Sequence, residues 1–176
     1  MLGRPDVKRS CLALLLFSLF ISATALADPV RLHAGAGLGV VVGLASGRNV
    51  RAGALNPTLV GDLGVRLAPA ASVYLRGEVG GIVLNNQAAG YAVAEWLPIH
   101  RLSLGTGVGV DAMASYAADS SKDNIWYGVS VPLIVGIGLV RTSAGTLRLG
   151  LEGAVGMNSA KVIGWHASTT LEWVWN

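Results

Sequence analysis

Large apolar residues alternate with small or polar ones along most of the chain after its first 27 residues. Between residues 125 and 139, the odd positions are apolar, as at Tyr127 and Leu133, whereas many even positions are glycine or serine. Residues 163–175 repeat this alternation. A period of two is that of a β-strand, whose successive side chains point to opposite faces. The pattern therefore predicts strands.

The alternation recurs in eight segments, which makes an all-β fold the expectation. Their length suits tilted strands that cross a membrane, which need about 9–11 residues each. The segments are residues 30–42, 59–67, 73–79, 91–97, 102–111, 125–139, 147–155 and 163–175.

The connections between these segments also alternate in length. Residues 68–71, 98–101 and 142–145 predict tight turns, whereas 44–56 and 115–124 predict long polar loops. The two connections at 84–90 and 157–160 are short to intermediate. With both ends of the barrel on the tight-turn side, this asymmetry is typical of outer-membrane barrels, which have short periplasmic turns and longer outer loops.

Charged residues test which face meets lipid, because a lipid-facing charge near the bilayer midplane costs about 2–4 kcal/mol. Glu95 lies opposite the apolar row if Ala92, Ala94 and Trp96 face lipid. The other strand charges lie on the small or polar face without exception: Arg31, Asp62, Arg66, Arg76, Glu78, Asp111, Arg148, Glu152 and Glu172.

Aromatic residues should gather at the two membrane interfaces. Trp96 and Trp173 lie near the tight-turn ends of their strands, whereas Tyr91 and Trp165 lie toward the loop ends, and we expect none in the strand middles. By parity, Tyr74 and Trp126 face inward.

A soluble barrel with the opposite orientation is the alternative. However, eight strands enclose little more space than side chains fill, which suits the glycine-rich face, and the continuous leucine and valine rows would expose a large apolar surface to water. The prediction is an eight-stranded antiparallel up-and-down transmembrane β-barrel.

The first 27 residues have the features of a secretory signal peptide. Lys8 and Arg9 precede an apolar core that is too short to span a bilayer as a membrane-anchoring helix, and Ala25-Leu26-Ala27 fits a cleavage site. We expect residues 1–27 to be removed and residues 28–176 to form the barrel. Removal takes away three of 13 basic and one of 10 acidic residues, so residues 28–176 have nearly balanced charge. It also takes away the only cysteine, Cys11. This composition excludes disulfides and disfavours a nucleic-acid partner.

The pattern from Asp28 to Asn176 resembles the small eight-stranded outer-membrane barrels of the OmpA/OmpX type. The most specific element is Leu171-Glu172-Trp173-Val174-Trp175, which is similar to the aromatic-ended last strand of that family, with Asn176 as an added final residue. The resemblance implies a location in the outer membrane of a Gram-negative bacterium, contact with lipids and lipopolysaccharide, and insertion by the barrel-assembly machinery with periplasmic chaperones. We expect a non-enzymatic monomer with a structural or surface-interaction role.

The inward face predicts a polar network that fills the lumen. A hairpin at 157–160 would place Glu152 opposite His166, with Arg148 diagonal to Glu172, and barrel closure would bring Arg31 and His33 toward Glu172. We expect these six residues to plug the pore.

Other chemistry has weak support in the sequence. His166, Ser168 and Glu172 share the inward face and are similar to the catalytic set of outer-membrane lipid A deacylases, but residues two apart on a strand lie near 7 Å apart. A lipid-modifying enzyme and a small ligand- or solute-handling barrel therefore stay open as alternatives. No metal-ligand spacing is present, and no cofactor is expected. The glycines at period two lack the spacing of a phosphate loop and indicate close backbone packing. Pro132, inward and mid-strand, predicts a bulge.

Overall fold

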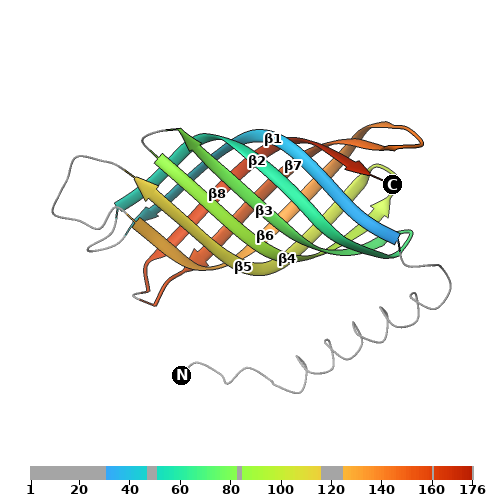
Figure 1. Cartoon of the computed structure of the whole chain (residues 1–176). Helices are drawn as coiled ribbons and strands as arrows, with labels where there is room; N and C mark the ends of the chain where they lie inside the picture. Colours follow the sequence, from blue (N-terminus) through green and yellow to red (C-terminus); the bar gives the residue numbers. More distant parts are fainter. Residues whose placement is uncertain (1–30, 47–50, 83–84, 116–124, 160, 176) are drawn as a thin grey trace, which may run out of the picture.

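The computed structural model describes residues 31–46, 51–82, 85–115, 125–159 and 161–175, and these form one closed antiparallel β-barrel (Figure 1). No described helix is long and apolar enough to cross a membrane. The expected signal peptide, residues 1–27, lies outside the described residues, as does most of the loop expected at 115–124. The strands are β1 (Arg31–Ser46), β2 (Arg51–Ala68), β3 (Ala71–Ile82), β4 (Asn85–Ile99), β5 (Leu102–Ser115), β6 (Ile125–Arg141), β7 (Gly145–Met157) and β8 (Ile163–Trp175).

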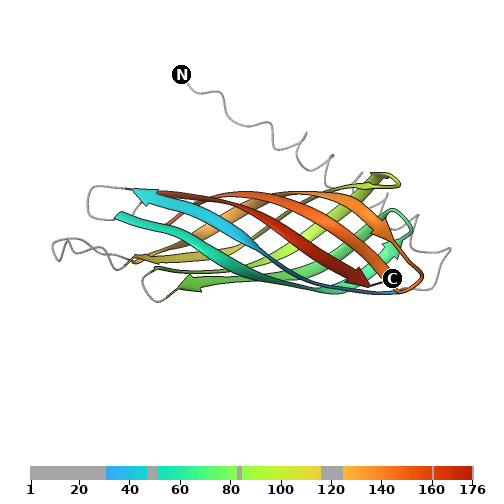
Figure 2. The same ribbon diagram turned by 90° about the horizontal axis from the view of Figure 1, so that it is seen from above.

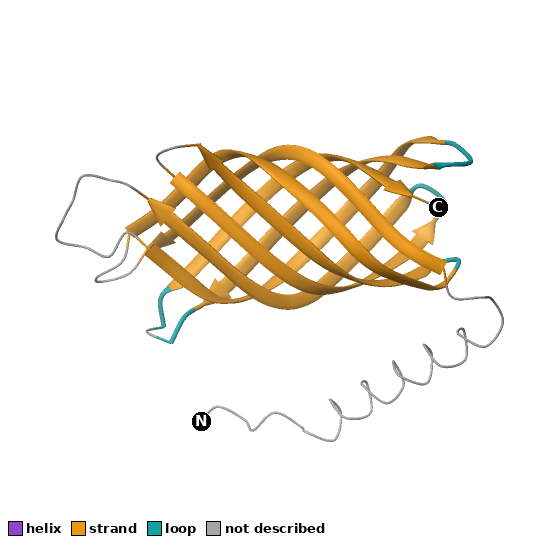
Figure 3. Ribbon diagram, in the orientation of Figure 1, coloured by secondary structure: helices purple, strands orange, loops and turns teal. Residues whose placement is uncertain are grey.

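Each strand pairs with its neighbours in sequence, and β1 closes the barrel by pairing with β8, where Leu38 lies opposite Leu171. The strands are tilted relative to the barrel axis, which Figure 2 shows from a second side. Figure 3 shows that strands make up almost the whole described chain. The predicted fold class is confirmed.

The three tight turns lie at one end of the barrel. They follow β2, β4 and β6, and the start of β1 and the end of β8 lie at the same end (right in Figure 1). The long loop expected at 44–56 is wrong, because β1 continues to Ser46 and β2 begins at Arg51. The connection expected at 84–90 is also wrong, since β4 begins at Asn85. In both places small or polar residues obscured the period of two.

The side chains sort into an apolar outer face and a polar inner face, as expected. Leu133 in the middle of β6 is 61% exposed, whereas Glu78 on β3 is fully buried. Glu95 faces inward and its neighbour Trp96 outward, which confirms the parity assigned to β4. The outer rows thus form a continuous apolar band around a charged interior.

The expectation that strand middles lack aromatic residues is wrong. Tyr91 lies near the middle of β4, opposite Arg76 of β3, and is buried inside the barrel. The error arose because the strand extends six residues before Tyr91.

The bulge expected at Pro132 is also wrong. Pro132 is buried, as predicted, but the β5–β6 register is the same on both sides of it, from Thr106↔Leu133 to Gly109↔Ser130. The Thr106 hydroxyl donates to the Pro132 carbonyl over 2.9 Å. The register shifts instead between Arg66 and Ala68, Trp96 and Ile99, and Gly138 and Val140, all at the tight-turn end.

Glycine on the inner face makes room for the charged side chains. A Cβ added at Gly37 would lie 2.6 Å from Cγ of Glu172, its partner across the β1–β8 seam. Close packing at the seam thus explains this glycine better than a phosphate-binding role.

Candidate functional site: the charged barrel interior

Arg76 of β3 is the centre of the interior network. Its Nη1 donates to both oxygens of Asp62 (2.9 and 3.1 Å), its Nε to Glu152 (2.7 Å) and its Nη2 to Glu172 (2.7 Å). These carboxylates come from β2, β7 and β8, so one guanidinium joins four strands across the lumen. All of its donor nitrogens are satisfied, which a buried cation requires.

Arg148 of β7 extends the network toward the tight-turn end. Its Nη1 donates to both oxygens of Glu95 (3.0 and 2.9 Å), and its Nη2 and Nε donate to Oε2 of Glu172 (2.5 and 2.9 Å). The Tyr74 hydroxyl donates to Glu95 over 2.5 Å. Glu172 therefore bridges the two arginines.

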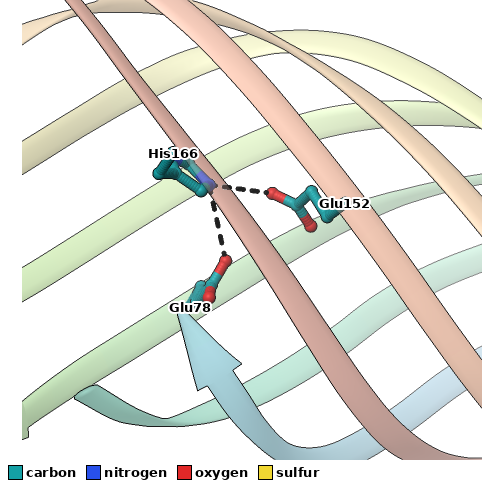
Figure 4. A group of neighbouring side chains, drawn as sticks. All are labelled: Glu78, Glu152 and His166. Atoms are coloured by element: carbon teal, nitrogen blue, oxygen red, sulfur yellow. Dashed lines mark hydrogen bonds and ion pairs between the residues drawn. The ribbon is translucent and has the colours of Figure 1, made fainter. Parts of the chain in front are cut away.

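A second group of polar side chains lies on the other side of Arg76, toward the loop end. Nδ1 of His166 lies 2.6 Å from Oδ2 of Asp111, and its Nε2 lies 3.4 Å from Oε1 of Glu152 and 3.8 Å from Oε2 of Glu78. Figure 4 shows the Glu78 and Glu152 carboxylates converging on the imidazole. Glu152 contacts both Arg76 and His166 and so connects the two groups.

The described interior carries more negative than positive groups. Its buried ionisable residues include two arginines, Arg76 and Arg148, and two histidines, His33 and His166. Against these stand six buried carboxyl groups: Asp62, Glu78, Glu95, Asp111, Glu152 and Glu172. The two arginines pair with the carboxylates in the tight-turn half of the lumen. The excess of carboxyl groups therefore lies around His166.

The two ends of the lumen are lined by different kinds of residue. Trp126, Met113, Val162 and Ala45 form a buried apolar cluster near the loop end, where the Trp126 indole donates to the Val162 carbonyl over 3.2 Å. A cavity of about 400 Å³ lies at the tight-turn end. Its lining includes His33, Arg66, Glu95, Arg101, Arg141 and Arg148.

Four of the six predicted network residues make ionic contacts in the network: Arg148, Glu152, His166 and Glu172. His33 is buried but stacks on the Tyr74 ring at 4.4 Å, and neither of its nitrogens has a hydrogen-bond partner. Arg31 is exposed, because β1 begins three residues before its pairing with β8. The prediction that Arg31 reaches Glu172 is therefore wrong.

The register of the last hairpin differs from the expectation. Glu152 lies opposite Ser168 rather than His166, and Arg148 lies directly opposite Glu172. The contact between Glu152 and His166 survives as a diagonal one across the hairpin. The connection is longer than the expected turn at 157–160, because Met157 at the end of β7 pairs with Ile163 at the start of β8.

The proposed catalytic set is not assembled. All three side chains face inward, but the Ser168 hydroxyl has no hydrogen-bond partner, while His166 is held by Asp111 and Glu152. A serine nucleophile needs its base within hydrogen-bond reach. The His166–Ser168 pair lacks this contact.

Sequence reasoning placed Arg76, Asp62, Glu95, Glu78 and Asp111 on the inner face but not in the network. The sequence predicts contacts only between neighbouring strands, whereas Arg76 reaches Glu152 and Glu172 across the lumen. The usable signal was the small barrel size, since eight strands bring opposite walls within reach of long side chains. The Glu78–Glu152–His166 group comes from three separate strands, so its residues do not have the short sequence spacing by which a metal site is recognised.

Comparison with known proteins identifies the fold. No family model and no curated protein sequence matches the chain. Among solved structures, Neisserial surface protein A superposes with a TM-score of 0.59 at 11% identity, over 83% of this chain and 99% of that one. Ail, the attachment invasion locus protein of Yersinia pestis, was solved with the heparin analogue sucrose octasulfate and superposes with a TM-score of 0.50 at 9% identity, over 82% and 99% of the two chains. The closed eight-stranded barrel, its apolar outer band and these superpositions together show that the chain has the fold of the small outer-membrane barrels of the OmpA/OmpX type.

Proposed function

We propose that the protein is a non-enzymatic integral protein of the Gram-negative outer membrane, with a lumen closed to ions and a structural or surface-interaction role. The observation that carries the proposal is the triple engagement of Arg76 by Asp62, Glu152 and Glu172. A guanidinium held from three directions across the axis blocks the path that an ion would take. The apolar outer band supplies the surface that lipid requires.

Export and assembly complete the proposal. A signal peptide at residues 1–27 would deliver the chain to the periplasm, and chaperones and the barrel-assembly machinery would insert it among lipids and lipopolysaccharide as a monomer. The similar structures include a surface protein and an attachment protein by their names. We therefore propose a role at the cell surface for the loop end of this barrel.

The closed lumen is tested by single-channel recording of the purified, folded protein in a planar bilayer. We expect no steady conductance from the wild type. We expect Arg76→Ala, combined with Arg148→Ala, to raise the frequency of open events, because both obstructing side chains are shortened. Steady wild-type conductance contradicts the closed lumen.

The lipid-modifying alternative has its own test. Ser168→Ala removes the only hydroxyl of the candidate catalytic set and, with the hydroxyl unbonded, should leave folding intact. We expect cells that produce this variant and cells that produce the wild type to have the same lipid A species by mass spectrometry. A lipid A species that disappears with the hydroxyl would establish the enzyme instead.

A further inference from the structure

Three acceptor-bearing side chains converge on one point in the loop-end half of the lumen. Nε2 of His166 lies 3.4 Å from Oε1 of Glu152 and 3.8 Å from Oε2 of Glu78, and one ligand atom from each residue lies within 4.8 Å of the others (Figure 4). Ligand atoms bound about 2.1 Å from a tetrahedral centre are roughly 3.4 Å apart. The spacing thus approaches that of a coordination shell.

Each of the three side chains is held by an atom other than the one that points into the group. Oε1 of Glu78 accepts from Thr58 over 3.1 Å, Oε2 of Glu152 accepts from Arg76 over 2.7 Å, and Nδ1 of His166 contacts Asp111 over 2.6 Å. A carboxylate on the far nitrogen of a histidine is the usual outer partner of a metal ligand, because it fixes the tautomer and turns Nε2 toward the metal.

Buried polar atoms without a hydrogen-bond partner occur on Glu78 and on two residues that neighbour the group. Glu78 is fully buried, yet its Oε2 has no hydrogen-bond partner, and the same holds for the buried hydroxyls of Ser168 and Tyr91. The Tyr91 ring stacks on His166 at 6.3 Å, and Ser168 lies opposite Glu152. A buried carboxylate oxygen without a partner is costly unless a cation or proton faces it.

We propose that Glu78, Glu152 and His166 form a binding site for one divalent metal ion of the zinc type. One imidazole nitrogen with two carboxylate oxygens is a donor set that suits Zn²⁺ and similar first-row ions better than Mg²⁺ or Ca²⁺, which take oxygen ligands. Two positive charges also offset the carboxyl groups that the arginines leave unmatched in this half of the lumen. The site is structural, since it is enclosed and joins β3, β7 and β8.

The enclosure determines how the site must be loaded. Trp126, Met113 and Val162 form an apolar cluster on the loop side of the site, and the Arg76 network lies on the other side. Glu78, Glu152 and His166 are each no more than 4% exposed, so the metal is best supplied while the barrel folds. The full chain without any added histidine tag should be folded into detergent micelles with Zn²⁺, dialysed, and analysed for bound zinc.

We expect one zinc per wild-type barrel. Glu78→Gln should weaken zinc binding at least tenfold, as measured by competition with a chelator, and Asp111→Asn should weaken it about 10- to 100-fold by freeing the imidazole. Glu95→Gln, a buried carboxyl group in the Arg148 part of the network, is the matched control and should bind zinc like the wild type. His100→Ala removes an exposed histidine and controls for binding at the surface.

Two results overturn the proposal: a wild-type barrel that folds with Zn²⁺ yet retains well under one equivalent, or a Glu78→Gln barrel that binds zinc as tightly as the wild type. Either would leave a protonated His166 as the partner of the carboxylates. If Glu78→Gln fails to fold, X-ray absorption of the wild-type zinc complex tests the site by identifying the ligands of the zinc ion. We expect one imidazole and otherwise oxygen ligands, and a spectrum without imidazole overturns the site.

Discussion

The guanidinium of Arg76 on β3 donates to the carboxylate of Glu172 on β8 over 2.7 Å, although 96 residues separate them in the chain. The contact crosses the lumen instead of following the β-ladder, because β1 and β2 lie between these strands in the wall. Opposite walls of the barrel are thus held by charge, while neighbouring strands are held by backbone hydrogen bonds.

Loss of the Arg76 side chain should be strongly destabilising. Arg76→Met leaves Asp62, Glu152 and Glu172 without their shared partner in a buried site, and breaking such a pair costs about 3–5 kcal/mol. Urea unfolding in lipid vesicles, followed by tryptophan fluorescence, measures this difference. Arg31→Ala is the control, since Arg31 is exposed and should change the free energy of unfolding by less than about 0.5 kcal/mol. Equal stabilities of the two variants would mean that the network contributes little.

Sequence reasoning reached the fold because alternation is a local property. In β6, the pattern of residues 125–139 matches the exposed and buried positions of the strand almost throughout. Sequence reasoning failed where the alternation is weak. The glycines and alanines near Gly53 and Ala88 lack side chains large enough to mark a face, so the predicted strands are shorter than β2 and β4.

The interior site was less accessible to sequence reasoning. Arg148 and Glu172 were predicted to meet because they lie on neighbouring strands. Arg76 was not, because its partners depend on the diameter of the closed barrel. Arg31 was misplaced because the offset between β1 and β8 at the seam is set by the whole barrel and by no single hairpin.

Gly164 on β8 leaves space for the Trp126 indole. A Cβ at this position would lie 2.7–2.8 Å from three atoms of the ring, so Gly164→Ala must displace Trp126 and the apolar cluster around it. Overpacking of this kind costs about 1–3 kcal/mol. Near-ultraviolet circular dichroism should report the disturbed tryptophan, and urea unfolding the lost stability.

Gly153→Ala is the matched control, because a Cβ there would have no atom within 4 Å. We expect it to keep the wild-type spectrum and stability. A Gly164→Ala barrel with the same spectrum as Gly153→Ala would show that Trp126 does not pack against β8 as described.

The depth of an outward residue should set the cost of placing a charge there. Leu133 lies at the centre of β6 and is 61% exposed, whereas Ile125 begins the strand at the loop end and is 62% exposed. Leu133→Arg should cost about 2–4 kcal/mol, and Ile125→Arg about 0–1 kcal/mol. Reversible unfolding in vesicles compares the two. Equal costs would argue against a bilayer centred on Leu133.

The outward orientation of the apolar rows is tested most directly by spin labels on the outer face. Residues 28–176 contain no cysteine, so cysteines introduced singly at Val131, Leu133 and Ile125 of the barrel can be labelled cleanly after reconstitution in lipid vesicles. We predict that labels at Val131 and Leu133 collide with dissolved oxygen and are shielded from a water-soluble nickel reagent, while the label at Ile125 is reached by the nickel reagent. Labels at Val131 and Leu133 that the nickel reagent reaches as freely as Ile125 would contradict the membrane-facing outer surface on which the account depends.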